Sequence, residues 1–97
     1  MQPIKKVEII ISEYYQPTLL NLLQDLGIQN YSVIPNLTGA GGRGLQTGGG
    51  FNEEFNNCMV MIACEDILFN KIIEPVREFL KKTGGICLVT EAVWLAH

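Results

Sequence analysis

Basic side chains are scarce in this chain of 97 residues, which has seven lysines and arginines against ten aspartates and glutamates. The resulting net charge of −3 leaves no basic surface of the kind that binds a phosphate backbone. Histidine occurs once, at position 97, and chain ends usually fray, so a positioned general base is not expected. The composition therefore argues against nucleic-acid binding and against histidine-based catalysis.

Long hydrophobic runs are also missing. The longest nearly apolar runs, at 7–11 and 58–64, are far shorter than the roughly 20 residues that cross a bilayer. The first residues include two lysines but lack the apolar stretch and cleavage pattern of a signal peptide. We therefore expect a cytoplasmic protein that does not insert into a membrane.

Paired cysteines and metal-ligand clusters are absent as well. Cys58, Cys64 and Cys87 contain no C-x-x-C spacing, which favours free thiols over a disulfide framework. All three fall in apolar stretches, where a thiol is unreactive and fills space. The acidic pairs at 53–54 and 65–66 lack the cluster of histidine and cysteine ligands expected of a transition-metal site, so neither a metal site nor an enzyme is expected.

Hydrophobic periodicity predicts four strands and two helices. Apolar and β-branched residues alternate at 3–12, 31–37, 55–64 and 86–95, although Pro35 marks its strand as an edge or a bulge. Leucines at helical spacing predict one helix over 16–27. The β-α-β-β-α-β order is that of the ferredoxin-like α+β fold, an antiparallel sheet with two helices on one face.

The second helix is predicted over 67–80. Asp66 is placed as its N-terminal cap, Pro75 should disturb its middle, and two glycines at 84–85 should end it. With both helices on one sheet face, the other face needs water or a partner. Apolar side chains remain for that second face, namely Ile10, Met59, Met61, Cys87 and Val89. We therefore expect an apolar second face and an oligomer.

Glycine is concentrated between positions 39 and 50, with seven of its ten occurrences. Residues 39–44 fit the pattern G-x-G-x-x-G, but 45–50 cannot start the helix that a Rossmann site requires. Two interpretations stay open: a flexible hairpin connection, or a nest of amides that holds an anion beside Arg43. The length exceeds the roughly 2–5 residues of ordinary hairpin loops, which favours a functional, mobile segment.

A second glycine-containing stretch, 81–85, ends the second helix. Lysines there commonly satisfy the last carbonyl groups and the helix dipole. The alternative is that Lys81 and Lys82 meet a phosphate beside exposed amides of Thr83, Gly84 and Gly85.

Four short motifs carry a family resemblance. They are Tyr31-Ser32-Val33 after the first helix, Thr38-Gly39-Ala40-Gly41-Gly42-Arg43-Gly44 at the start of the long loop, Thr83-Gly84-Gly85-Ile86 before the last strand, and Glu91-Ala92-Val93 within it. With this architecture the chain resembles the PII signal-transduction superfamily, and within it the compact regulators related to the bicarbonate-transport regulator SbtB. The architecture matches over nearly the whole chain as a single domain, 1–97.

The resemblance implies a non-enzymatic signalling protein that forms a homotrimer and needs no cofactor. Its effector would be an adenine nucleotide (AMP, ADP, ATP or cyclic AMP) in the clefts between subunits. Segment 39–55 would be the T-loop, which docks on a regulated partner protein such as a membrane transporter or an enzyme. Carried over by position, the nucleotide- and anion-binding residues are Ser32, Gly41, Gly42, Arg43, Lys82, Thr83, Gly84 and Gly85.

The chain departs from the family pattern in two phosphate-binding regions. The loop at 83–85 is shorter than usual, and 93–97 lacks the R-x-R of classical members. A monophosphate, a diphosphate, a cyclic nucleotide or no nucleotide therefore stays open. Two alternatives share the strand order: an ACT-like amino-acid-binding domain and an acylphosphatase-like hydrolase. The long loop disfavours the ACT-like domain. The hydrolase would need an arginine near the first strand, whereas Arg43 and Arg77 lie elsewhere.

Overall fold

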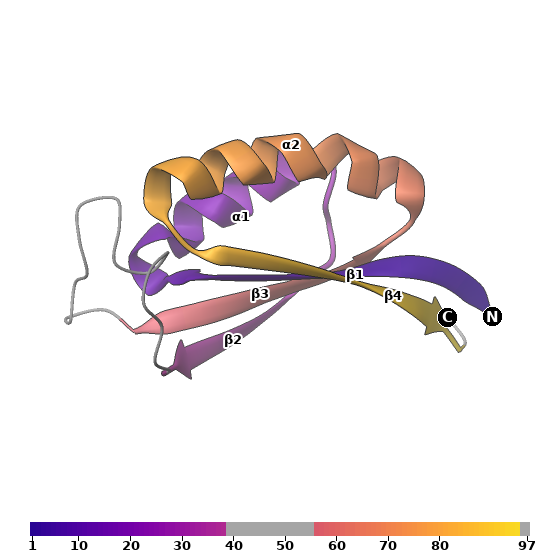
Figure 1. Cartoon of the computed structure of the whole chain (residues 1–97), viewed down its shortest axis with the longest axis horizontal. Coiled ribbons are helices and arrows are strands. Elements are labelled where there is room, and N and C mark those ends of the chain that lie inside the picture. The colour runs from indigo at the N-terminus through magenta and orange to yellow at the C-terminus, as the bar shows by residue number, and fades with distance from the viewer. Residues whose placement is uncertain (39–55, 96–97) are drawn as a thin grey trace.

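The computed structural model describes residues 1–38 and 56–95, which form one antiparallel sheet and two helices (Figure 1). The four strands lie in the order β2-β3-β1-β4, and every neighbouring pair is antiparallel. The elements are β1 (Gln2–Ser12), the short 3-10 helix η1 (Glu13–Tyr15), α1 (Gln16–Asp25), β2 (Ser32–Leu37), β3 (Asn57–Cys64), α2 (Asp66–Thr83) and β4 (Ile86–Trp94). This arrangement confirms the predicted ferredoxin-like α+β fold. The predicted loop segment, 39–55, lies outside the described residues.

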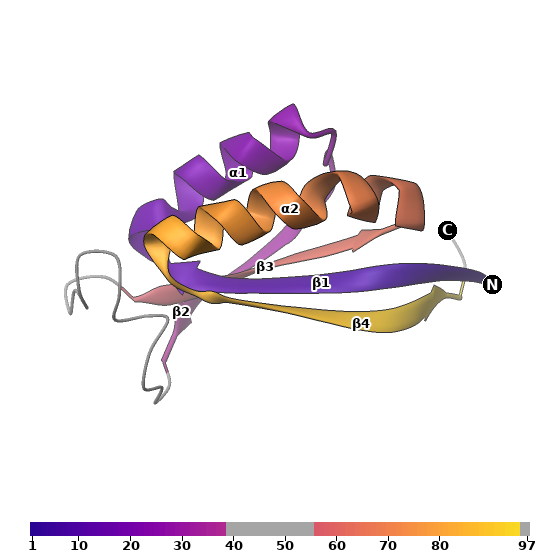
Figure 2. The same cartoon turned by 45° about the horizontal axis from the view of Figure 1, so that its top comes forward.

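The core lies between the two helices and one face of the sheet (Figures 1 and 2). Alternate residues of the two central strands point to this face, so that Val7, Ile9 and Ile11 of β1 are all buried. Their register partners on β3 are Ile62, Val60 and Cys58, which are buried as well. The helices complete the core with side chains at helical spacing: Leu19 and Leu23 from α1, and Ile72 and Val76 from α2. A fully buried aliphatic side chain contributes about 1.5–3 kcal/mol, so this cluster accounts for most of the drive to fold.

The helix boundaries differ slightly from those predicted. Asp66 is the first helical residue of α2, and Glu65 occupies the cap position without a capping hydrogen bond from its side chain. The assignment of Asp66 as the cap was therefore wrong by one residue. Helix α2 also continues through Pro75 without a break, because Ile72 and Val76 on either side are anchored in the core and tertiary packing outweighs the lost hydrogen bond.

Neither helix of the described residues covers the second face of the sheet, which is largely apolar (Figure 1). Cross-strand register places Ile34, Met59, Ile10 and Ile86 in one row across all four strands. Two residues along, Met61 and Leu88 flank Glu8 on the same face. We call this set of six apolar residues the open face: Ile10, Ile34, Met59, Met61, Ile86 and Leu88.

The prediction of an apolar second face is correct for three of its five residues. Cys87 pairs with Ile9 and Val89 pairs with Val7, so both lie on the helix-covered face. The reason is the period of two along a strand, which places odd-numbered residues of β4 opposite odd-numbered residues of β1. Their neighbours Ile86 and Leu88 occupy the open face instead, and both are exposed.

Candidate functional site

The turn from α2 into β4 contains four of the predicted anion-binding residues, Lys82, Thr83, Gly84 and Gly85. Gly84 follows the last helical residue with φ of 78°, and its amide donates to the carbonyl oxygen of Leu80 at 2.8 Å. This amide caps the helix, so it is not free for a ligand as the sequence had suggested. Gly85 has φ of 122°, which L side chains rarely adopt. The two glycines thus give the turn its shape.

The side chains of this turn differ in what they can offer. The hydroxyl of Thr83 lies 3.2 Å from the carbonyl oxygen of Phe79 and 2.8 Å from that of Gly84. Because it donates to the backbone, it can meet a ligand only as an acceptor or by exchanging partners. Lys82 is exposed and forms no ion pair within the described residues, whereas Lys81 pairs with Glu78 at 3.1 Å. Lys82 is therefore the cation of this turn that is available to an anion.

An apolar hollow lies directly beside the turn, between α2 and the edge strand β4. It has a volume of about 470 Å³ and is lined by Ile73, Val76, Arg77, Leu80, Lys81, Gly85, Ile86, Cys87 and Val89. Its walls are aliphatic, and the basic residues Arg77 and Lys81 stand at its border. A ligand with an apolar ring and an anionic group fits such a combination.

Ser32 lies far from this turn within one protomer. It is exposed at the start of β2, where it pairs with Met61 of β3. Strands β2 and β4 form opposite edges of the sheet, three strand intervals apart, which corresponds to about 14 Å at the usual strand spacing. One chain therefore does not bring Ser32 and the turn together. The other predicted residues, Gly41, Gly42 and Arg43, lie outside the described residues.

The described residues that flank segment 39–55 lie at the same end of the sheet as the turn. Leu37 pairs with Asn57 beside Ser12, and Ile86 pairs with Ile10 only two residues along β1. Strand β2 is irregular just before it ends, with a register shift between Ile34 and Leu37. The sheet thus places Lys82–Gly85 and the attachment points of the long loop on one side of the molecule (Figure 1).

Three residues that the sequence did not indicate tie these attachment points together. The Glu13 carboxylate accepts a hydrogen bond from the amide of Asn36 at 2.8 Å, and the Glu13 amide donates to the carbonyl oxygen of Asn56 at 2.7 Å. The Asn56 side-chain amide closes the ring by donating to the Asn36 side-chain oxygen at 3.0 Å. We call this set, Glu13, Asn36 and Asn56, the loop clasp. Its one sequence signal is the tolerance of asparagine for positive φ, since Asn36 has φ of 60°.

The described residues show no arrangement for nucleophilic or metal chemistry. Burial is the main cause that raises the pKa of each thiol, in Cys58, Cys64 and Cys87. Nearby carboxylates raise the pKa further at Cys58 (Glu13) and at Cys64 (Asp66). The thiols are thus protonated near neutral pH and poor nucleophiles. Within 1–38 and 56–95, no group of three or more metal-ligating side chains is placed to hold an ion.

The fold, the long β2–β3 connection and the helix-to-strand turn together define a PII-like protein. The sequence model of the nitrogen regulatory protein P-II family matches residues 4–95, and the chain belongs to this family. Among curated proteins, no sequence matches the chain significantly.

Solved structures of PII-like proteins are similar to this chain over nearly its full length. The structure of CPII from Thiomonas intermedia K12 bound to ADP, AMP and acetate has a TM-score of 0.79 at 25% identity, covering 98% of this chain and 91% of that chain. The apo form of the same protein has a TM-score of 0.74 at 27% identity, covering 93% and 89%. A PII-like signalling protein from Thermus thermophilus shares the fold at 18% identity, with a TM-score of 0.72 and coverage of 94% and 87%.

Proposed function

We propose that this protein is a non-enzymatic PII-like regulator, which binds an adenine nucleotide between the subunits of a trimer and passes the signal to a partner protein through segment 39–55. The observation that carries the proposal is the placement of the Lys82–Gly85 turn at the same end of the sheet as both attachment points of that segment. A ligand held at the turn lies next to the base of the loop. Its binding can therefore favour one loop conformation over another, provided that the two conformations differ in affinity.

The division of the predicted site between two sheet edges supports a cleft between subunits. Ser32 lies on the β2 edge and the turn leads into the β4 edge, so only a second copy can bring the two edges together. The open face and the two unpaired edge strands give each copy surfaces for such contact. The same two features favour a trimer packed around its sheets.

A nucleotide with one or two phosphates suits the turn better than a triphosphate. The turn offers one unpaired cation, Lys82, and its Gly84 amide is already used by the helix. Two CPII structures from Thiomonas intermedia K12 contain ADP and AMP, which makes these two nucleotides the first ones to examine. The apolar hollow beside the turn would take the base and Lys82 the phosphate.

The family assignment replaces the ACT-like and acylphosphatase-like alternatives. We propose that the regulator acts in the cytoplasm on a membrane transporter or an enzyme. In the described part of the chain, neither helix is long and apolar enough to span a membrane.

The proposal is tested by isothermal titration calorimetry of the purified protein with AMP, ADP, ATP, cyclic AMP and bicarbonate. We expect saturable binding of AMP or ADP, and at least fivefold weaker binding of that nucleotide to Lys82→Ala. Lys71→Ala is the matched control, because Lys71 is also an exposed lysine of α2 but lies far from the turn. Absence of binding by every nucleotide, or equal affinity in both variants, would contradict the proposed site.

A further inference from the structure

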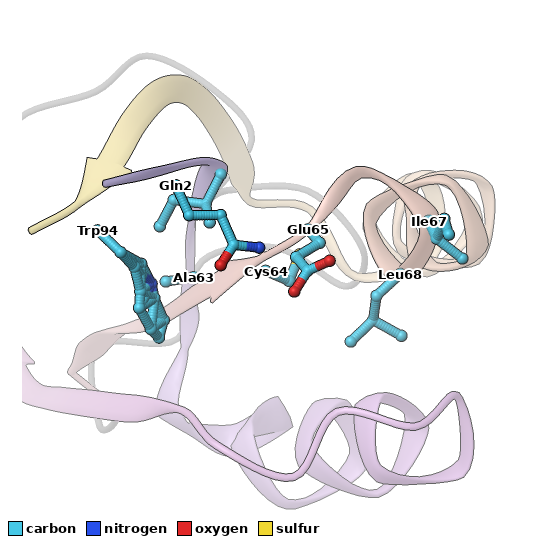
Figure 3. Close-up of a pocket in the computed structure, with 8 residues that line it drawn as sticks. Gln2, Ala63, Cys64, Glu65, Ile67, Leu68 and Trp94 are labelled. Atoms are coloured by element: carbon cyan, nitrogen blue, oxygen red, sulfur yellow. The ribbon is translucent and has the colours of Figure 1, made fainter. Parts of the chain in front are cut away.

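A second hollow lies at the end of the sheet remote from the turn (Figure 3). Strand β1 faces Ile86 at Ile10 but faces Trp94 at Gln2, so eight residues of extended chain, about 27 Å, separate the two ends. The hollow forms because β3 ends at Cys64, opposite Lys5, while β1 continues to Gln2 without a β3 neighbour. Its volume is about 500 Å³, within the range of small-molecule sites.

The walls of this hollow are apolar and its polar groups are few. Ile4, Ala63, Cys64, Ile67, Leu68 and Trp94 line it, together with Gln2 and Glu65. In Figure 3 the Gln2 carboxamide and the Glu65 carboxylate lie between the Trp94 ring on one side and Leu68 on the other. An indole face, an aliphatic wall and one carboxylate thus line the same space.

The charge around the hollow is negative. A shallower depression adjoins it, shares Glu65 with it and adds Asp66 and Glu91. Among the described residues, those that line the two spaces include these three acids and no lysine or arginine. The nearby Lys5 is already engaged, since its ammonium pairs with Glu91 and lies 3.6 Å from Asp66. Phosphate-bearing ligands are therefore disfavoured here and cations are favoured.

The Glu65 carboxylate takes part in none of the capping hydrogen bonds or ion pairs of the described residues. Glu65 occupies the cap position of α2, but its side chain makes no capping hydrogen bond, and it forms no ion pair in the described parts of the chain. The backbone carbonyl of Glu65, rather than its side chain, accepts a hydrogen bond from the Phe69 amide at 2.9 Å. A ligand can therefore use this carboxylate without breaking a bond of the folded protein.

We propose that this hollow binds a small organic cation, an ammonium group on an apolar or aromatic body. The body would pack against Leu68, Ile4 and the Trp94 ring, and the ammonium would lie beside the Glu65 carboxylate. The indole face attracts the same positive charge. Within one protomer this site shares none of the residues proposed to bind the nucleotide, and it differs from the Lys82–Gly85 turn in charge and in its place on the sheet.

The test uses Trp94, the one tryptophan of the chain, as an intrinsic fluorescent probe. Phenethylammonium is titrated against 2-phenylethanol, which has nearly the same shape but no charge. We expect saturable quenching by both, with phenethylammonium bound at least fivefold more tightly. In Glu65→Gln the two ligands should bind within about twofold of each other. Asp25→Asn, which removes an exposed carboxylate at the end of α1, should keep the wild-type preference.

Three outcomes would overturn the proposal: no saturable change in Trp94 fluorescence, equal affinity for the alcohol and the ammonium in the wild type, or displacement of phenethylammonium by AMP. The last outcome would mean that the hollow belongs to the nucleotide site. Trp94→Leu, followed by calorimetry, should weaken phenethylammonium about two- to fivefold through loss of the indole face. Failure to bind nucleotides in the separate calorimetric test would leave this proposal untouched.

Discussion

Gly85 shows how one residue fixes the junction between α2 and β4. A Cβ at this position would lie 2.7 Å from the carbonyl oxygen of Ile10 and 2.9 Å from the Cγ2 atom of Ile11. Both neighbours belong to β1, one of the two central strands, so neither can move without disturbing the sheet. The close approach of Gly85 to β1 is what allows β4 to begin pairing at Ile86.

Gly85→Ala should therefore lower the free energy of unfolding by about 2–4 kcal/mol, through a backbone clash added to an unfavourable φ of 122°. Urea unfolding followed by far-UV circular dichroism measures this loss. Gly27→Ala is the matched control: its φ is 102°, but a Cβ added there would lie 3.6 Å from its nearest neighbour, the Cδ1 atom of Leu68. It should cost only about 1 kcal/mol. Equal losses in the two variants would show that the clash contributes nothing.

The three cysteine thiols, two of them buried and that of Cys87 partly buried, make the folded state less stable at alkaline pH. In the folded state the pKa values of Cys58, Cys64 and Cys87 are raised above the usual 9.0, chiefly by burial. As pH rises past about 9 the unfolded chain loses these protons first, so the folded state holds more protons and the free energy of unfolding falls. Urea unfolding at pH 7.5 and at pH 10 should show this decrease. Cys58→Val should show a smaller decrease, and an identical one would exclude Cys58 as a contributor.

At the scale of elements, periodicity predicted the strands and helices to within a few residues, because the leucines of α1 and the alternation in β1 reflect burial directly. Rules based only on neighbouring residues gave wrong predictions at two places in α2, where contacts with the rest of the fold determine the structure. Helix α2 continues through Pro75, and its cap falls on Glu65 rather than Asp66. Of the candidate site, the sequence predicted the position of the Lys82–Gly85 turn, because two glycines end α2 there, and ligand binding at this turn stays a prediction. The loop clasp was not predicted, because its three residues come from separate segments, a juxtaposition that no local pattern encodes.

The loop clasp holds the end of β2 in place. Asn36→Gly keeps the positive φ easily but loses the side-chain bond to Asn56, and it should lower the free energy of unfolding by about 0.5–1 kcal/mol. Asn36→Val should cost about 2 kcal/mol, because a β-branched residue is strained at φ of 60° and the side-chain bond to Asn56 is lost. Glu13→Ala should cost about 1 kcal/mol through the lost bond to the Asn36 amide. Urea unfolding of the three variants tests the order, and a Val variant as stable as the Gly variant would contradict it.

At the scale of the whole molecule, the structure of a single copy does not explain why the open face is apolar. Ile34, Ile86 and Leu88 are all exposed there, although one sheet face already supplies a complete core. Contiguous apolar surface of this kind marks a protein contact. In the trimer that we propose, the apolar row that crosses all four strands packs against the open faces of the other copies, so that three sheets enclose a common interior.

Leu88→Lys should therefore convert the trimer that we propose into smaller species. Leu88 is 54% exposed in one copy, so a lysine there leaves the protomer core intact but places a charge in the contact between copies. Size-exclusion chromatography with light scattering should give about three subunits for the wild type and fewer for Leu88→Lys. Ile67→Lys is the control, because Ile67 is 77% exposed on α2, away from the open face, and its variant should stay trimeric. Dissociation by both variants, or by neither, would show that the open face does not hold the copies together.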